Sequence, residues 1–216
     1  MTILYEGYRL PDIVRHEIDR DFTRERVVFT GALIPLCAVV GRITKGAPTA
    51  AADAGNTGNG TVADLALGSL AEIGTYHLEC SQAVAGSGIF HVLTPAGHRL
   101  EDLIVGSPYV SPHLALTLGD GDADFAVGDE FTVTVPPGSG KCKLLDPAAV
   151  DGSQVAAGIS LERYNAATTD VRGIIIARDA IVIDALLSWP EGITAGQKTK
   201  ALADLAAKGF KFAQGV

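Results

Sequence analysis

Residues 27–45 read VVFTGALIPLCAVVGRITK, two runs of apolar and β-branched residues that are interrupted at Gly31 and Pro35. Val, Ile and Thr favour strands, and Gly and Pro favour the breaks between them. The same pattern predicts strands over residues 155–161, 171–177 and 181–187. These stretches indicate a β-rich core that is built from residues 27–45 and 141–216.

The segment 46–140 differs from its flanks in composition. It opens with GAPTAAADAGNTGNG at residues 46–60 and is closed by PPGSGK at 136–141, and both stretches are typical of flexible linkers. Between them apolar and polar residues alternate, as in residues 76–80, YHLEC, which places His77 and Glu79 on a solvent-facing side. Further alternation at 114–118 and 131–135 predicts a small β-sandwich or barrel that is inserted into the core.

One helix is predicted near the end of the chain. Thr194 and Gln197 have the spacing of a capping box, and Leu202 and Leu205 follow at helical spacing. Gly209 stands where a C′ glycine belongs. The expected fold class is therefore α+β and β-dominated, with a β-rich core, one C-terminal helix and an inserted all-β module.

The first 26 residues are polar and highly charged, with few periodic apolar positions. This composition predicts an extended N-terminal arm over residues 1–26 that orders on binding a partner. A short amphipathic helix over residues 12–22 is the alternative.

Composition and charge exclude several classes of partner. The chain has 216 residues, 47% of them hydrophobic, and a net charge of −8. Residues 46–140 carry eleven acidic side chains and a single basic one, Arg99, which argues against nucleic acid as a partner. No apolar run approaches the roughly 20 residues of a membrane span. Cys37, Cys80 and Cys142 are far apart and odd in number, so we expect buried thiols.

No motif predicts catalysis, a cofactor or a metal. The GSGK stretch at 138–141 lacks the first glycine of a phosphate loop and the hydroxyl residue after the lysine. Asp120, Asp122 and Asp124 have calcium-loop spacing, but Phe125 and Phe131 occupy positions where that loop needs glycine and glutamate. The histidines form no i, i+4 pair, and no nucleophile elbow is present. We therefore expect a protein that is not an enzyme.

Several collinear motifs carry a family resemblance. They are residues 31–43, DGSQVAAGI at 151–159, residues 171–176, Arg178–Ala180, LSWPEG at 187–192 and the helix that ends at Phe210. In this order they resemble the head decoration proteins of tailed phages, the lambda D type. The resemblance covers residues 27–45 and 144–216. The insert is similar, more loosely, to a β-module that recurs in phage structural proteins.

The resemblance implies a capsid decoration, or cement, protein. Such proteins are homotrimers that bind the major capsid protein at three-fold and quasi-three-fold positions outside the expanded head and brace it against internal DNA pressure. The expected location is the outer capsid surface of the virion, after synthesis in the host bacterial cytoplasm. The alternatives are a virion surface module that recognises host glycan through the insert, another virion component such as a tail protein, and an unrecognised enzyme.

Two sets of residues are expected to make the contacts. We expect the N-terminal arm to add as a strand to an open edge of the major capsid protein. Trp189 and Pro190 are expected to anchor the last strand before the helix, or to lie at a subunit interface. The capsid-binding residues of the arm would be Ile3, Leu4, Tyr5, Tyr8, Leu10 and Ile13.

Overall fold

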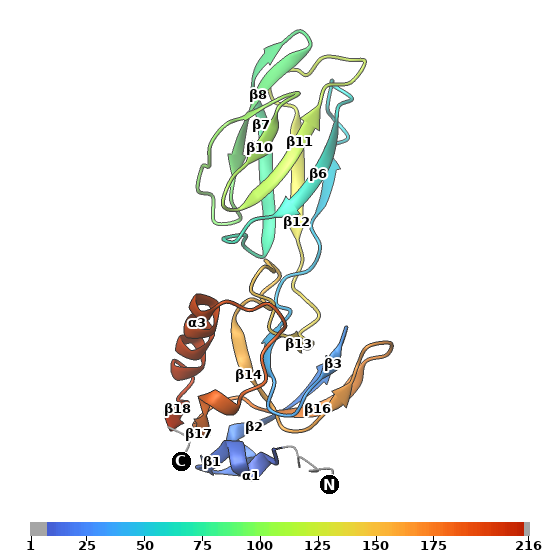
Figure 1. Cartoon of the computed structure of the whole chain (residues 1–216). Helices are drawn as coiled ribbons and strands as arrows, with labels where there is room; N and C mark the ends of the chain where they lie inside the picture. The colour runs from blue at the N-terminus through green and yellow to red at the C-terminus, as the bar shows by residue number, and fades with distance from the viewer. Residues whose placement is uncertain (1–7, 214–216) are drawn as a thin grey trace. The chain divides into compact units, whose positions relative to one another are not determined.

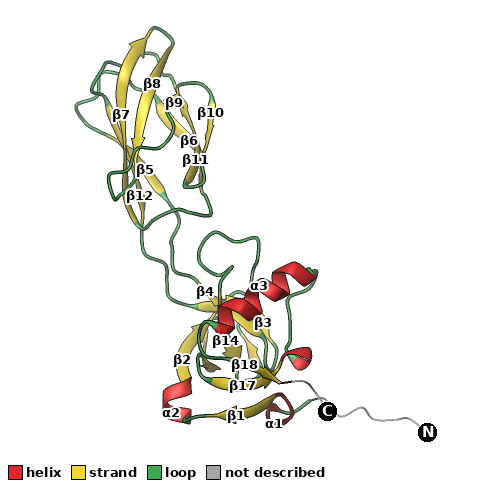
Figure 2. Ribbon diagram, turned by 90° about the vertical axis from the view of Figure 1, so that its left-hand side faces the viewer, coloured by secondary structure: helices red, strands yellow, loops and turns green. Residues whose placement is uncertain are grey.

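The computed structural model describes residues 8–213. Its contacts divide the chain into two compact units: a core unit of residues 1–44 and 139–216, and an inserted unit of residues 45–138. In Figure 1 the elements of the inserted unit run from cyan to yellow, and those of the core unit are blue or orange to red. Figure 2 shows that strands dominate both units. The β-dominated fold class with one longer, C-terminal helix is confirmed.

A closed five-stranded barrel forms the centre of the core unit. The side chains of Phe29, Val40, Cys142 and Ile175 are buried in one of its two apolar clusters. The strands follow the order β13 (Cys142–Leu144), β2 (Arg24–Phe29), β16 (Val171–Ile176), β14 (Ala156–Ser160) and β4 (Val39–Arg42).

Smaller elements flank the barrel. Strand β17 (Ala180–Ile183) lies between β1 (Val14–Glu17), to which it is antiparallel, and β18 (Lys211–Ala213), to which it is parallel. The strand predicted at 181–187 ends at Ile183, because Asp184 turns the chain into a short 3-10 helix and accepts the Ala185 N–H at 2.9 Å. The flanking elements are α1 (Leu10–Ile13), β1 (Val14–Glu17), α2 (Arg20–Thr23), the pair β3 (Leu33–Ile34) and β15 (Tyr164–Asn165), β17 (Ala180–Ile183), η1 (Asp184–Leu186), α3 (Ala195–Ala206) and β18 (Lys211–Ala213).

Helix α3 begins and ends where its sequence predicts. The Gln197 N–H donates to Thr194 Oγ1 at 3.3 Å, and Gln197 Oε1 accepts the Thr194 N–H at 2.9 Å, which is the predicted capping box. At the other end the Phe210 N–H donates to the Leu205 carbonyl and the Gly209 N–H to the Ala206 carbonyl. This pair of bonds is the Schellman arrangement, and Gly209 takes the positive φ of +86° that it requires. Leu205 is fully buried, which fastens the helix to the core unit.

The N-terminal segment is not an extended arm over its described part, residues 8–26. Two single-turn helices, α1 and α2, stand on either side of β1, so the alternative of one amphipathic helix over 12–22 is also wrong. The reason is burial combined with capping. Ile13 is only 2% exposed in the core, and the acidic residues that suggested a solvated arm accept backbone N–H groups: Asp12 from Arg9, and Asp19 from Asp21, both at 2.8 Å.

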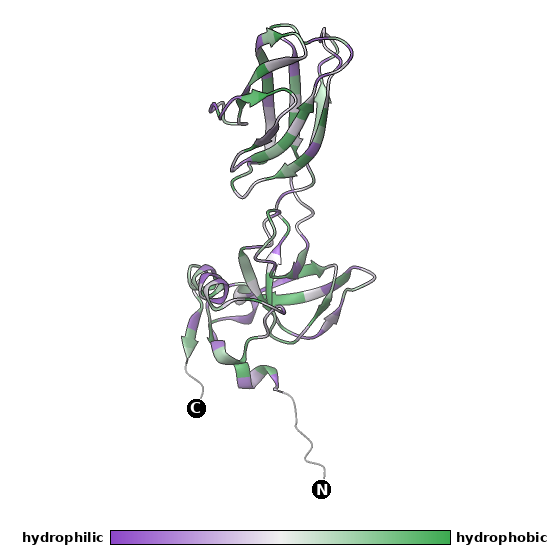
Figure 3. Ribbon diagram, turned by 45° about the horizontal axis from the view of Figure 1, so that its top comes forward, coloured by the Kyte–Doolittle hydropathy of each residue, from purple (hydrophilic) through white to green (hydrophobic). Residues whose placement is uncertain are grey.

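The inserted unit is a β-sandwich with its own core. Its two sheets share one apolar cluster, in which Tyr76, Leu78 and Cys80 are buried while His77 and Glu79 are exposed, as their alternation predicts. Hydrophobic and hydrophilic bands follow one another along its strands in Figure 3. One sheet has five strands, in the order β5 (Thr49–Ala52), β12 (Glu130–Val135), β7 (Gly74–Val84), β8 (Ser87–Leu93) and β9 (Leu103–Ile104). The other has three strands, in the order β10 (Pro108–Val110), β11 (Leu114–Gly119) and β6 (Thr61–Leu67).

The stretch predicted as a flexible linker, residues 46–60, is ordered in the structure. Thr49–Ala52 forms the edge strand β5, which pairs with β12 although all four of its side chains are exposed. Its order comes from backbone bonding that composition does not reveal, since strand pairing needs no buried side chain. The loop that follows is held by Asp129, which accepts the N–H groups of Thr57 and Gly58, both at 2.9 Å.

The two segments that join the units run beside each other. In the core unit the Ile43 N–H donates to the Lys141 carbonyl at 2.9 Å. In the inserted unit the Gly46 N–H donates to the Pro136 carbonyl at 2.8 Å, and Lys45 and Pro137 form a β-bridge. The chain thus leaves the core unit and returns to it at neighbouring positions.

Candidate interaction surface

The predicted capsid-binding residues do not share one environment. Ile3, Leu4 and Tyr5 lie outside the described residues. Tyr8 is 65% exposed, whereas Ile13 is buried and Leu10 packs against the same apolar cluster. The side chain of Ile13 therefore belongs to the core of this chain and that of Leu10 is partly buried against it, and their contact with a partner stays a prediction.

A groove of about 470 Å³ lies beside this N-terminal segment. Ile13 forms part of its wall, and Tyr8 and Leu33 remain exposed within it. We call it the N-terminal groove. Exposed apolar side chains around a concavity are typical of interaction sites. Its lining is Tyr8, Ile13, Leu33, Pro35, Leu36, Arg163, Leu186 and Ser188.

The segment that carries Tyr8 is fixed to the barrel by polar contacts as well as by burial. Arg24 binds Glu17 through two bonds, Nε to Oε2 at 2.8 Å and Nη2 to Oε1 at 3.1 Å. Arg178 donates from Nη1 to the Phe22 carbonyl at 2.8 Å, and its guanidinium lies 5.5 Å from the Phe22 ring centroid. This bidentate pair and the cation–π contact hold residues 10–24 in place without a partner.

Trp189 and Pro190 lie partly buried where the chain approaches α3. Trp189 packs against the apolar cluster that contains Leu205, and Lys198 Nζ lies 5.7 Å from the centroid of its ring. Just before it, the Ser188 carbonyl accepts the Val39 N–H at 3.0 Å. Trp189 therefore contributes to packing between α3 and the barrel; its role at a subunit interface stays a prediction.

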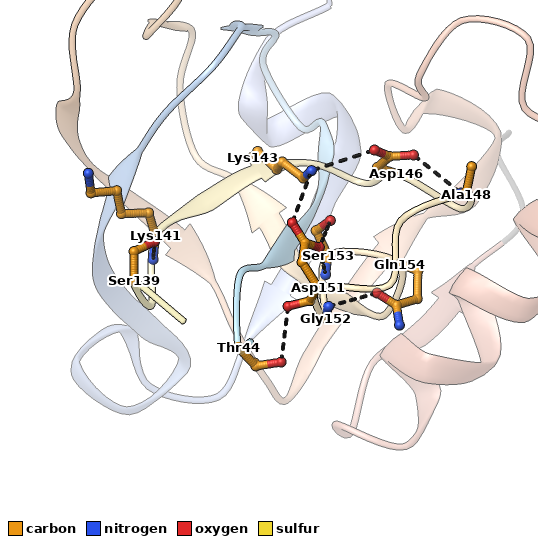
Figure 4. Close-up of polar contacts among 10 residues, drawn as sticks. All are labelled: Thr44, Ser139, Lys141, Lys143, Asp146, Ala148, Asp151, Gly152, Ser153 and Gln154. Carbon is orange, nitrogen blue, oxygen red and sulfur yellow. Dashed lines mark hydrogen bonds and ion pairs between the residues drawn. The ribbon is translucent and has the colours of Figure 1, made fainter. Parts of the chain in front are cut away.

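The motif at residues 151–154 forms a tight turn beside the barrel (Figure 4). Asp151 accepts the Ser153 N–H at 2.9 Å and lies 3.3 Å from Lys143 Nζ. Burial acts to raise the pKa of Asp151, but the bonds from Ser153 and the charge of Lys143 outweigh it, and the pKa lies below its usual range. Ser153 is buried, and a side chain on Gly41 would overlap its carbonyl. These residues are structural.

The GSGK stretch is a loop whose lysine is ion-paired. Ser139 Oγ accepts the Lys141 N–H at 3.4 Å, and Lys141 Nζ binds Asp170 at 2.5 Å. An ion-paired lysine on a loop that leads into strand β13, and not into a helix, does not form the cradle that a phosphate needs.

The described residues bring together no group of three metal-ligating side chains. All three cysteines are buried and unpaired, and burial raises the pKa of the Cys37 thiol to about 12. A protonated, buried thiol is a poor nucleophile at neutral pH. No helix within residues 8–213 is long and apolar enough to span a bilayer.

Sequence reasoning found two residues of the N-terminal groove, Tyr8 and Ile13, and missed the others. Leu33 and Leu186 belong to distant segments that only the barrel brings together. The apolar run around Pro35, which contains Leu33, was a local signal, but such a run does not distinguish a groove from an ordinary strand.

Comparison with known proteins gives one informative match. A family model described as "Bacteriophage lambda head decoration protein D" matches residues 3–210. No curated protein matches the chain.

The similar solved structures include two crystal forms of one protein and a flagellar hook junction protein. FlgL of Xanthomonas campestris in one crystal form is 19% identical, and the match covers 46% of this chain and 31% of that chain with a TM-score of 0.33. In another crystal form it is 16% identical, and the match covers 80% of this chain and 44% of that chain with a TM-score of 0.32. The flagellar hook junction protein FlgK from Burkholderia pseudomallei is 24% identical, and the match covers 56% of this chain and 21% of that chain with a TM-score of 0.34. The chain thus spans less than half the length of each, and likenesses this low support no functional argument.

Proposed function

Since this chain belongs to the bacteriophage lambda head decoration protein D family, its role is phage capsid decoration, and we propose that it acts as a homotrimer bound to the outside of the expanded head at three-fold and quasi-three-fold positions. The observation that carries the proposal is the extent of the match, from residue 3 to residue 210, which includes the N-terminal segment, the barrel and the terminal helix.

The proposed mechanism is stabilisation by contact. A protein that binds the expanded shell and not the unexpanded one stabilises the expanded state by about 4 kcal/mol when it is present at a thousand times its dissociation constant. A trimer that holds neighbouring subunits of the major capsid protein gains further through effective concentration. Such a device needs rigid surface and no chemistry. The two separately packed units supply it, since each has its own buried core.

We assign the capsid contact to the residues that precede α1 and to the N-terminal groove. Ile3, Leu4, Tyr5 and Tyr8 would contact the major capsid protein, and Leu33 and Leu186 would accept an apolar side chain from it. Leu10 and Ile13 support this surface from within. Trp189 and Pro190 remain candidates for the contact between copies in the trimer.

The inserted unit is proposed to point away from the shell and to be dispensable for trimer formation. Residues 45–138 carry eleven acidic and two basic side chains, a charge that suits the outside of a particle filled with nucleic acid. Host glycan recognition by this unit is the second candidate function, and a role in the tail is the third. Glycan-array binding by the purified protein, and its location in a cryo-EM map of the parent particle, test these two alternatives.

The deciding experiment mixes purified protein with expanded shells that lack it. Native mass spectrometry is expected to give a trimer, and cryo-EM to show density at the three-fold positions. Deleting residues 2–8 should abolish occupancy and leave the trimer intact; replacing residues 46–136 with a short Gly-Ser linker should preserve both. A wild-type chain that is monomeric at high concentration and leaves the shells bare would overturn the proposal.

A further inference from the structure

A second groove, of about 720 Å³, lies in the wall of the barrel and is lined by residues of β2, β16 and β4 and by the loop 139–141. Val28 and Ile174 supply apolar surface there, and the remaining charged lining is entirely basic. We call it the basic groove. Its lining comprises Arg26, Val27, Val28, Arg42, Ser139, Gly140, Lys141, Arg172, Gly173 and Ile174.

The backbone of β2 is open toward this groove. The Thr23 carbonyl accepts the Ala177 N–H at 2.8 Å, so the odd-numbered residues of β2 bond toward β16 and the even-numbered ones face the opposite side. On that opposite side β13 pairs with β2 only at Cys142 and Phe29. Within the described chain, no strand therefore pairs with Arg26 on the groove side.

Two of the four basic side chains that line the groove form ion pairs with acidic residues of the described chain, and two do not. Arg42 binds Glu25 at 2.9 Å and Lys141 binds Asp170 at 2.5 Å. Arg26 and Arg172 are exposed, and neither makes an ion pair or side-chain hydrogen bond with another residue in the range 8–213. The pairing of Arg172 with Val28 and of Arg26 with Ile174 puts both guanidiniums on the outer face of the same two strands.

A strand edge and two guanidiniums that have no partner within residues 8–213, together with apolar flanks, fit an extended, acidic polypeptide segment. We propose that the basic groove binds such a segment of the major capsid protein, which adds as a strand beside Arg26–Val28 and places carboxylates against Arg26 and Arg172. This inference rests on the proposed capsid role, and it identifies a second contact, separate from the N-terminal groove. An uncharged or basic segment would leave both guanidiniums without a partner, so charge complementarity selects the occupant.

The test compares two double charge reversals that change the net charge equally. R26E/R172E alters the groove, whereas K200E/K211E alters exposed lysines on α3 and β18. We expect R26E/R172E to bind expanded shells at least about tenfold more weakly than wild type, with a shallower dependence on salt, and the control to bind as wild type does. Native mass spectrometry should show the wild-type oligomeric state for both.

A third variant tests strand addition independently of charge. The backbone N–H that V28P removes faces the groove and not β16, so the hydrogen bonds between β2 and β16 are kept. We therefore expect shell binding to fall while the circular dichroism spectrum is unchanged. Equal binding of R26E/R172E and wild type would refute the inference and leave the capsid role standing. A changed oligomeric state in R26E/R172E would also refute it, by assigning the groove to a second copy. Failure of wild type itself to bind would instead overturn the proposed function.

Discussion

Asp129 is expected to be the most important single polar residue for the stability of the inserted unit. The residue is only 4% exposed, and its carboxylate accepts three backbone N–H groups: Thr57 at 2.9 Å, Gly58 at 2.9 Å and Ala126 at 3.0 Å. It therefore joins the loop after β5 to the turn before β12. The substitution D129N keeps the shape of the side chain and removes its charge.

The expected loss follows from these three bonds. A hydrogen bond to a charged group contributes about 1.5–3 kcal/mol and a neutral one about 0.5–1.5 kcal/mol, so each bond weakens by roughly 1 kcal/mol. The amide also turns one N–H₂ group toward a backbone N–H. We expect a loss of about 3 kcal/mol from the free energy of unfolding of the inserted unit, out of roughly 5–15 kcal/mol for a typical domain.

Native-state hydrogen exchange measures this loss in each unit separately. The slowest amides of β7 and β8 report the inserted unit, and those of β14 and α3 report the core unit, which should be unchanged because the two units have separate cores. The matched control is D124N, since Asp124 is exposed and accepts one N–H, from Gly86 at 2.8 Å. A loss below about 0.5 kcal/mol in D129N, or one equal to that of D124N, would refute the reasoning.

Three further predictions concern pH and the terminal helix. Burial acts to raise the pKa of Asp129, but the three backbone N–H donors outweigh burial, and the pKa lies below its usual range. The stabilisation by Asp129 is therefore complete above the unfolded pKa of about 3.9 and is lost as the pH falls through the folded pKa. Acid titration of unfolding should show this loss of stability in wild type and not in D129N. L205A should destabilise the core unit by about 2–5 kcal/mol in urea denaturation and the partly buried L202A by less, and equal losses would contradict the packing described. G209A should lower the melting temperature, because φ is +86° and an added Cβ would overlap the Asp179 carboxylate, whereas G196A in open space on the same helix should lower it little or raise it.

Features that depend on neighbouring residues could be predicted from the sequence. The alternation in Tyr76–Cys80 depends on the two-residue period of a strand, and the Thr194–Gln197 cap depends on one helical turn. Both are properties of a few consecutive residues, and both are confirmed. The fold class, which is the sum of such local patterns, was within reach for the same reason.

Features that depend on distant partners could not be predicted. Strand β5 is held by the backbone of β12, and the N-terminal turns are held by a core to which β17 and α3 contribute. In both cases the local composition, small residues in one and charges in the other, is typical of unfolded chain. The basic groove likewise requires that β2 and β16 be paired in one particular register, which no single segment encodes.

The hydrogen bond from Ile43 to Lys141 in the core unit and the one from Gly46 to Pro136 in the inserted unit each join the outgoing segment of the chain to the returning segment. A foreign domain whose two ends lie as close together as those of residues 46 and 136 could be grafted there without lengthening any loop of the barrel. Under the proposed function, in which the inserted unit is dispensable for capsid binding, each copy of such a chimera would carry the grafted domain on the particle.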